Sequence, residues 1–181
     1  MLETILAFIM SLVMQFLGGS SVDMSPVDIS LDEPISAEVL SVTDGDTIKV
    51  RIDGRTETVR YIGIDTPEPY RDGEPACYSK QATERNQMLV EGKVVQLVAD
   101  AEDRDRFDRL LRYVYVDGEL VNETLIAEGF ATTLTIKPNT SKADQFANAE
   151  ENAQAAGLGL WSACHDQVSL WEPTSRLTAG A

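Results

Sequence analysis

The sequence predicts a mainly β domain with helices (α+β), built as a five-stranded barrel with three helices. Two observations favour this class. Short β-branched runs come first and arrive as hairpins, and the helical patterns are inserted between and after them instead of alternating with single strands. This order is typical of a small Greek-key β-barrel, the OB-fold, and not of a parallel doubly wound sheet. At 181 residues, 43% of them hydrophobic and 25% charged, the chain can bury one core of that size.

The first three predicted strands form a meander. They are expected at residues 38–42, 47–52 and 56–64. The Asp-Gly pairs at 44–45 and 53–54 separate these runs, and Asp-Gly between apolar runs is a strong hairpin signal.

Two further strands and three helices follow the meander. Apolar residues near helical spacing, each stretch ended by a glycine, predict the helices, while short apolar or alternating runs predict the strands. The expected helices span 78–91, 121–128 and 142–156, and the expected strands span 93–99 and 110–116.

Charge limits how this chain can meet nucleic acid. It has 30 Asp and Glu against 15 Lys and Arg, a net charge of −15. A broad basic surface is excluded because phosphates would meet net repulsion, but a local basic cleft is not excluded. Residues 36–160 hold 14 of the 15 cations together with 23 acids, so such a cleft would lie in this part of the chain.

The N-terminal residues predict export. Residues 4–17 form an apolar run followed by small residues, which resembles a secretory signal although no Lys or Arg precedes it. The run is short for a spanning helix, which needs about 20 residues. The alternatives are a helix that packs on the domain or on a partner, and a wrongly assigned start codon that has removed the basic residues.

These patterns divide the chain into four parts. We expect a signal or membrane-anchor segment at 1–19, an acidic linker at 20–35, the barrel domain at 36–163 and a C-terminal tail at 164–181. The expected location is extracytoplasmic, either secreted or membrane-anchored. The expected oligomeric state is a monomer.

Acidic residues and one arginine gather at the second and third predicted strands. They are Asp44, Asp46, Arg60, Asp65 and Glu68. Carboxylates from separate strand ends, with a backbone carbonyl, can supply the oxygen ligands of a hard cation such as Ca²⁺. The simpler interpretation is that Asp-Gly-Asp is only a turn. Arg60 and Asp65 would face opposite sides of an ideal strand, so they can share a site only if the chain turns near Asp65, where Thr66-Pro67 is suited to a turn.

Five motifs together resemble the staphylococcal-nuclease-like (thermonuclease) family. They are DGDT at 44–47, RYIGIDTPE at 60–68, DRFDRLLRYVYVDG at 105–118, VNETLIAEGFA at 121–131 and GLGLW at 157–161. They follow the family's order and spacing. The resemblance implies an OB-fold barrel with three helices and Ca²⁺-dependent hydrolysis of phosphodiester bonds in DNA and RNA, which would be bound transiently as substrates.

The resemblance also implies a calcium site. Asp46 and Asp65 are similar to the family's calcium carboxylates, and Thr66 would supply a backbone carbonyl. Asp44 stands at the position of a further acid near the ion.

Three more residues carry the implied catalysis. Glu68 resembles the residue that positions or deprotonates the attacking water, and Arg60 and Arg109 resemble the pair that clamps the scissile phosphate. Arginine suits this role because its fork donates two parallel hydrogen bonds to phosphate and stays charged. A carboxylate near a cation has a low pKa, so Glu68 is expected mainly to orient the water.

Two segments depart from the family pattern. Phe107 and Asp108 stand where the family often has Tyr and Gly, and Asp108 either weakens phosphate binding at the neighbouring Arg109 or holds the loop. The family's base-stacking tyrosines have no equivalents in residues 132–136. Stacking would then be weaker, or supplied by one of three other tyrosines: Tyr61, Tyr70 or Tyr113.

Cys77 and Cys164 are the two cysteines of the chain. They can form one bridge in an oxidising compartment or remain free thiols. The expected export favours the disulfide, which would tie the C-terminal segment to the first predicted helix.

Two other functions compete with the nuclease. The same barrel can serve as a catalytically weak or inactive module that binds nucleic acid or protein, and the acidic composition suits a calcium-binding domain. A degenerate copy should have lost some of the five implied site residues, and all five are present: Asp46, Arg60, Asp65, Glu68 and Arg109. A calcium-binding domain would not account for the two arginines. The sequence therefore predicts an enzyme, a phosphodiesterase with Ca²⁺ as its cofactor.

Overall fold

A computed structural model describes residues 33–69 and 74–164. The predicted segments 1–19, 20–35 and 164–181 lie outside the described residues, except for 33–35 and Cys164. The predicted barrel domain, 36–163, falls almost wholly within them. No helix in the described ranges is both long and apolar enough to cross a membrane.

Five strands close into a barrel, as predicted. β1 (Ile35–Val42), β2 (Thr47–Ile52) and β3 (Arg55–Tyr61) form the antiparallel meander, and β5 (Val94–Val98) and β6 (Leu110–Val116) continue the sheet beside β1. A parallel pairing of β3 with β6, in which Val59 lies opposite Leu110, closes the barrel. The predicted five-stranded OB-fold of an α+β domain is confirmed.

The third predicted strand is two strands in the structure. The chain turns at Ile62, and β4 (Gly63–Asp65) leaves the barrel to pair with β8 (Thr132–Leu134). Gly63 has a φ of 79°, and a Cβ there would lie 2.6 Å from the Phe146 ring. A residue with a side chain would be strained and obstructed at this turn. The single strand expected over 56–64 was therefore wrong.

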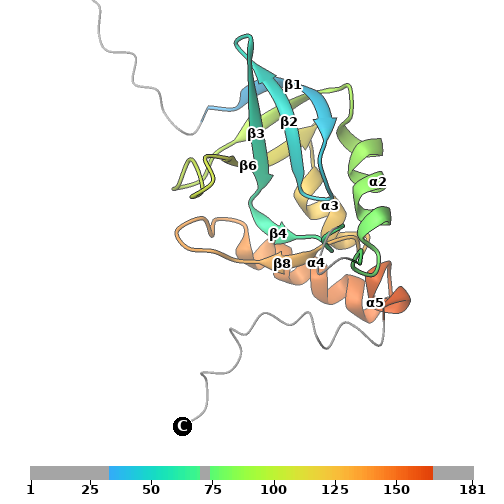
Figure 1. Cartoon of the computed structure of the whole chain (residues 1–181). Coiled ribbons are helices and arrows are strands. Elements are labelled where there is room, and N and C mark those ends of the chain that lie inside the picture. Colours follow the sequence, from blue (N-terminus) through green and yellow to red (C-terminus); the bar gives the residue numbers. More distant parts are fainter. Residues whose placement is uncertain (1–32, 70–73, 165–181) are drawn as a thin grey trace, which may run out of the picture.

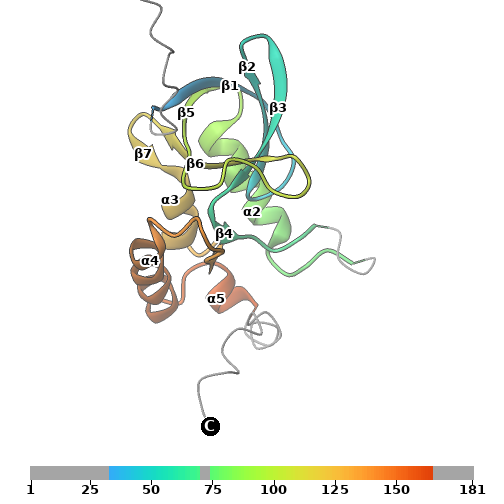
Figure 2. The ribbon, with the colours of Figure 1, turned by 90° about the vertical axis from the view of Figure 1, so that its left-hand side faces the viewer.

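All three predicted helices are present, and three short elements were not predicted. The helices are α2 (Ser79–Val90), α3 (Val121–Ala127) and α4 (Ala143–Ala155); the additional elements are β7 (Glu119–Leu120), β8 and α5 (Leu160–Ala163). Such short segments show no periodic pattern and are fixed by their neighbours. Figures 1 and 2 show the barrel above α3, α4 and α5, with α2 along one side of the barrel and β4 between the barrel and α4.

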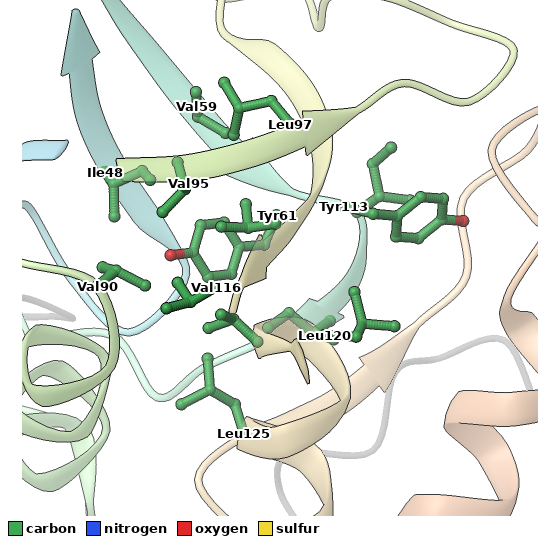
Figure 3. Packing of buried hydrophobic residues seen from close by; sticks show 14 of the residues in the cluster. Ile48, Val59, Tyr61, Val90, Val95, Leu97, Tyr113, Val116, Leu120 and Leu125 are labelled. Carbon is green, nitrogen blue, oxygen red and sulfur yellow. The ribbon is translucent and has the colours of Figure 1, made fainter. Parts of the chain in front are cut away.

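The barrel core consists of aliphatic side chains around a buried tyrosine. Figure 3 shows the Tyr61 ring among Ile48, Val90 and Val95. Its side chain is 1% exposed, and its hydroxyl donates a hydrogen bond of 2.9 Å to the Asn86 Oδ1 of α2. A buried hydroxyl needs such a partner, so the core already fixes α2 against β3.

Candidate active site

The Asp44-Gly45-Asp46 turn between β1 and β2 packs tightly on the chain that follows β4. A Cβ at Gly45 would lie 2.6 Å from Thr66 Oγ1, so only glycine permits this approach. Within the turn, the Asp46 N–H donates to Asp44 Oδ1 at 3.1 Å. The turn therefore serves both as a local Asp turn and as a means of bringing two distant acidic segments together.

Asp46 is a buried carboxylate held on several sides. Its side chain is 1% exposed. Its Oδ2 accepts hydrogen bonds from the Thr66 N–H at 2.8 Å and the Thr66 hydroxyl at 3.0 Å, and its Oδ1 accepts one from the Thr47 hydroxyl at 3.3 Å. These contacts fix the carboxylate between the start of β2 and the end of β4.

The Arg60 guanidinium on β3 bridges two of the predicted site carboxylates. Its Nη1 lies 3.2 Å from Asp46 Oδ2 and its Nη2 lies 2.9 Å from Asp65 Oδ1. Nη1 also donates to the main-chain carbonyl of Ile64 at 2.9 Å. Arg60 and Asp65 meet because the chain turns at Ile62-Gly63, before Asp65, and not at Thr66-Pro67 as the sequence suggested.

Positive charge is in deficit around Asp46. Burial, followed by the nearby Asp44 and Asp65 carboxylates, raises the pKa of Asp46 to about 7, although Arg60 and the Thr66 N–H act in the opposite direction. Burial is the largest of these causes, and beside it the three carboxylates of Asp44, Asp46 and Asp65 face one guanidinium.

This deficit fits a cation at the predicted position. The described part of the chain has no group of three or more His, Cys, Asp or Glu side chains arranged to hold a metal ion. The predicted ligand set needs only two carboxylates and a main-chain carbonyl. Two of these ligands, the Asp46 and Asp65 carboxylates, already bind the same cationic group, the Arg60 guanidinium. Carboxylate oxygens that converge in this way are the ligands that a hard cation such as Ca²⁺ prefers.

Glu68 lies in the electrostatic field of both the acids and the predicted arginine pair. Partial burial and the Asp44 and Asp65 carboxylates raise the pKa of this otherwise exposed residue, while Arg60 and Arg109 lower it. The net direction without a bound ion is upward, and the low pKa expected beside a cation stays a prediction. Glu68 and Arg60 belong to the same motif at 60–68, whereas Arg109 comes from the segment before β6, and the charges of both arginines act on Glu68.

Arg109 lies at the end of the segment between β5 and β6 and is held by Asp105. Asp105 Oδ2 accepts hydrogen bonds from Arg109 Nε at 2.8 Å and pairs with its Nη2 at 2.7 Å. Asp105 Oδ1 accepts from the main-chain N–H groups of Phe107 and Arg109. Figure 2 shows this segment in front of the barrel. Asp105 was not singled out in the sequence, because an i, i+4 spacing indicates an ion pair only on a helix, and residues 105–109 form a turn before β6.

Comparison with known proteins places the chain in a family. A family model described as Staphylococcal nuclease homologue matches residues 58–163, more than half of the chain. The chain belongs to the staphylococcal nuclease homologues. The predicted resemblance is thereby confirmed.

Several relatives of this nuclease homologue are named as nucleases. Endonuclease YncB of Bacillus subtilis (strain 168) is 43% identical over 141 residues, covering 75% of this chain and 62% of that protein. The SPbeta prophage-derived endonuclease YokF of the same strain is also 43% identical over 141 residues, covering 75% of this chain and 44% of that protein. Thermonuclease of Staphylococcus hyicus is 35% identical over 126 residues, covering 69% of this chain and 75% of that protein. The chain spans less than two thirds of the two Bacillus relatives.

In this nuclease homologue, Asp108 holds the loop. Its φ is 64°, in the left-handed region that glycine favours and that Asp tolerates. Its main-chain carbonyl accepts a hydrogen bond of 2.8 Å from Arg104 Nη1, and its carboxylate lies 3.5 Å from the same nitrogen. Arg109 instead pairs with Asp105. The sequence left open whether Asp108 weakens phosphate binding at Arg109 or holds the loop. These contacts support the second interpretation.

Two of the three tyrosines suggested for base stacking, Tyr61 and Tyr113, are unsuitable, and for these two the suggestion was wrong. The Tyr61 ring lies inside the core, and the Tyr113 side chain is 2% exposed with its hydroxyl bonded to Asp100. Tyr70 lies outside the described residues. The exposed ring beside the site is Phe107, at 64%, with the Arg106 and Arg109 guanidinium carbons 4.7 and 5.6 Å from its centroid. In the sequence, the position of Phe107 between Arg106 and Arg109 in the DRFDR motif could have indicated a ring for base stacking.

Cys77 and Cys164 are joined by a disulfide, with an S–S distance of 1.99 Å across a sequence separation of 87 residues.

Asn86 in α2 makes a hydrogen bond to the candidate site that the sequence analysis missed. The buried Asn86 amide donates a hydrogen bond of 3.1 Å to the Asp44 carbonyl, in addition to accepting one from Tyr61. No sequence pattern marks Asn86, because an Asn within a helix looks like any polar surface residue.

A hollow of about 540 Å³ between α3 and α4 is not a candidate for this chemistry. Its lining residues include Glu123, Asn152 and Leu158 but no Lys or Arg. Without a cation it cannot receive a phosphate.

Proposed function

We propose that this nuclease homologue is a Ca²⁺-dependent endonuclease that hydrolyses phosphodiester bonds in DNA and RNA. One observation carries the proposal. The Arg60 guanidinium lies 3.2 Å from Asp46 Oδ2 and 2.9 Å from Asp65 Oδ1, so a cation that could bind phosphate and carboxylates that could bind a metal ion lie side by side, with Glu68 three residues after Asp65. The printed names of the relatives, endonuclease and thermonuclease, agree with this chemistry.

The two arginines would bind the scissile phosphate. A phosphodiester gains negative charge as water attacks, and fixed guanidinium groups stabilise that charge without having to reorganise. Asp105 holds Arg109 by Nε and Nη2, so the orientation of the guanidinium is set before substrate binds. Arg60 is set in the same way by main-chain carbonyls and by Asp65.

Calcium would be held by Asp46, Asp65 and the Thr66 carbonyl. When bound, it supplies Lewis-acid stabilisation of charge on the phosphate and orients the reacting oxygens.

Glu68 would orient the attacking water and take its proton. Without the ion the pKa of Glu68 is raised, and a bound Ca²⁺ would lower it again, so Glu68, the exposed one of these acids, would mainly orient the water. Removing its charge should therefore reduce the rate by about 10²-fold or more.

The test uses the purified full chain with single-stranded DNA and with RNA, in Ca²⁺ or in chelator. We expect cleavage of both in Ca²⁺, no cleavage in chelator, and a loss of about 10²-fold in the Glu68→Gln variant. Glu91→Gln, which changes an exposed glutamate beyond α2, is the matched control and should keep the wild-type rate. A folded wild-type chain without Ca²⁺-dependent cleavage would instead indicate the non-catalytic binding module.

We also infer that the protein is exported, either secreted or anchored through residues 1–19. The apolar run at 4–17 supports this, and so does the Cys77–Cys164 bridge, because disulfides persist in oxidising compartments. Cell fractionation followed by intact-mass measurement tests both the location and the cleavage of the N-terminal segment. Recovery of the full-length chain in the cytoplasm alone would contradict export.

A further inference from the structure

The disulfide lies one residue away from a direct contact with Glu68. The Ala76 N–H donates a hydrogen bond of 3.0 Å to the Glu68 carbonyl, and Cys77 is the next residue. The Ala76 carbonyl in turn accepts from the Ser79 N–H at 3.1 Å, at the first residue of α2. The main chain of Glu68 is thus bonded to the short segment that the bridge anchors.

The other end of the bridge is fixed to the packed body of the protein. Cys164 is 7% exposed, and its N–H donates to the Leu160 carbonyl at 2.9 Å. The buried Leu160 donates its own N–H at 2.8 Å to the carbonyl of Gly129, which follows α3 in the chain. A continuous set of contacts therefore runs from α3 through α5 and the disulfide to the Glu68 carbonyl.

The acidic half of the site does not depend on this route. The Asp44 carbonyl is held by Asn86 in the middle of α2, and Asp46 is held by Thr66. Asn86 is fixed in turn by the core residue Tyr61. Opening the bridge should therefore loosen the segment bonded to Glu68, which then keeps its Ala76–Ser79 hydrogen bond to α2 but not its link to Cys164, while the carboxylates keep their places.

We propose that the Cys77–Cys164 disulfide is a positioning cross-link for Glu68, so that the nuclease is fully active only when the bridge is closed. This inference rests on the proposed nuclease function. Closure removes two electrons and two protons from the two thiols and transfers them to an external disulfide by thiol–disulfide exchange. A chain still in a reducing compartment would then be a weak nuclease until it reached an oxidising one.

The experiment compares the oxidised full chain with the same protein reduced by dithiothreitol, on single-stranded DNA in Ca²⁺. We expect reduction to lower kcat by about 10-fold, as a small misplacement of a catalytic group does, while circular dichroism stays native. Ca²⁺ binding, measured by calorimetry without substrate, should change by less than twofold. Cys164→Ser should show the same loss and no longer respond to reductant.

Two further variants separate positioning from stability. Arg85→Ala breaks another tie of α2, the ion pair of Arg85 with Glu128 at 2.6 Å, and should keep the wild-type kcat and its sensitivity to reductant. In a Glu68→Gln background, Cys164→Ser should not lower kcat further. The bridge acts on kcat only through Glu68, so the effects of the two substitutions should not add. All rates are measured at a temperature where circular dichroism shows each variant folded.

The outcomes distinguish this inference from the function it rests on. An oxidised wild type without activity would refute the proposed function. An active oxidised enzyme whose kcat is unchanged by reduction, or a full further loss from Cys164→Ser in the Glu68→Gln background, would refute the positioning role alone.

Discussion

Asp46 and Asp105 are both carboxylates paired with an arginine, yet their pKa values shift in opposite directions. Burial and neighbouring acids raise the pKa of Asp46 to about 7. Partial burial also acts to raise the pKa of Asp105, but hydrogen bonds from Arg109 and from the Phe107 N–H lower it overall. The difference reflects burial first: Asp46 is almost fully buried beside two further acids, whereas Asp105 is partly exposed and accepts hydrogen bonds from its own loop.

The two sides of the site are therefore built differently. The acidic side, around Asp46 and Arg60, is part of the barrel and gathers more negative charge than the protein neutralises. The loop side, around Asp105 and Arg109, is partly exposed and neutral as a pair. A cation bound at the acidic side would supply the positive charge that this side lacks.

The largest expected contrast comes from removing the two arginines in turn. Arg60→Ala and Arg109→Ala should each slow cleavage by about 10²-fold, since both groups stabilise the same transition-state charge. Only Arg60→Ala should also cost about 3 kcal/mol of folding stability above pH 7, where Asp46 is ionised and would be left as an unpaired buried charge. Arg109→Ala should cost less than about 1 kcal/mol, because its pair is partly exposed.

Cleavage rates and urea unfolding of both variants measure this contrast. Arg51→Ala, which removes an exposed ion pair with Glu38, is the control and should change neither quantity. Equal stability losses for Arg60→Ala and Arg109→Ala would show that the loop is as integral to the fold as the barrel.

The pH dependence of stability should differ in sign between the two carboxylates. Folded Asp46 keeps its proton to about pH 7, but the unfolded chain loses it near 3.8, so the folded state binds more protons between these values. Stability from Asp46 should therefore fall as pH rises through this window, by at most about 1.4 kcal/mol per pH unit. Asp105, with a lowered pKa, should instead contribute stability above its unfolded pKa and lose it as pH falls through the folded value.

Urea unfolding of the Ca²⁺-free protein from pH 4 to 8 measures these slopes. Asp46→Asn should remove the decline below pH 7, and saturating Ca²⁺ should remove it from the wild type. A decline that persists in Asp46→Asn would assign the titration to another group.

The sequence predicted the barrel well because hairpin turns and helix stops are local signals. It also named the acids and arginines that the structure brings together. It missed the break at Gly63, since a strand that leaves one sheet for another keeps the same apolar pattern. It likewise missed Asp105 and Asn86, whose importance depends on partners that the fold supplies. The tyrosines were misjudged because exposure of a ring is a tertiary property.

A smaller effect should follow from loosening Arg109 without removing it. Asp105→Asn keeps the shape of the side chain but removes the charge that holds Arg109 Nε and Nη2. We expect about 10-fold slower cleavage and a stability loss of about 1 kcal/mol or less, as for Arg109→Ala, because the pair is partly exposed. Asp108→Asn, which removes a charge from an exposed residue of the same loop, should leave both nearly unchanged. If the two variants behave alike, the net charge of the loop matters and the orientation of Arg109 does not.

The smallest expected effect concerns the exposed Phe107 ring. The ring lies next to Arg109 in the loop 105–109, where a base beside a bound phosphate could stack on it. Such stacking contributes about 1–3 kcal/mol per base. Phe107→Ala should raise KM about fivefold, at the low end of that range, without changing kcat or stability. Phe107→Leu keeps an apolar side chain but no ring. A KM for Phe107→Leu close to that of Phe107→Ala would indicate stacking on the ring. A KM for Phe107→Leu equal to that of the wild type would show that the loop offers only apolar contact, and that Arg109 alone binds substrate on this side of the site.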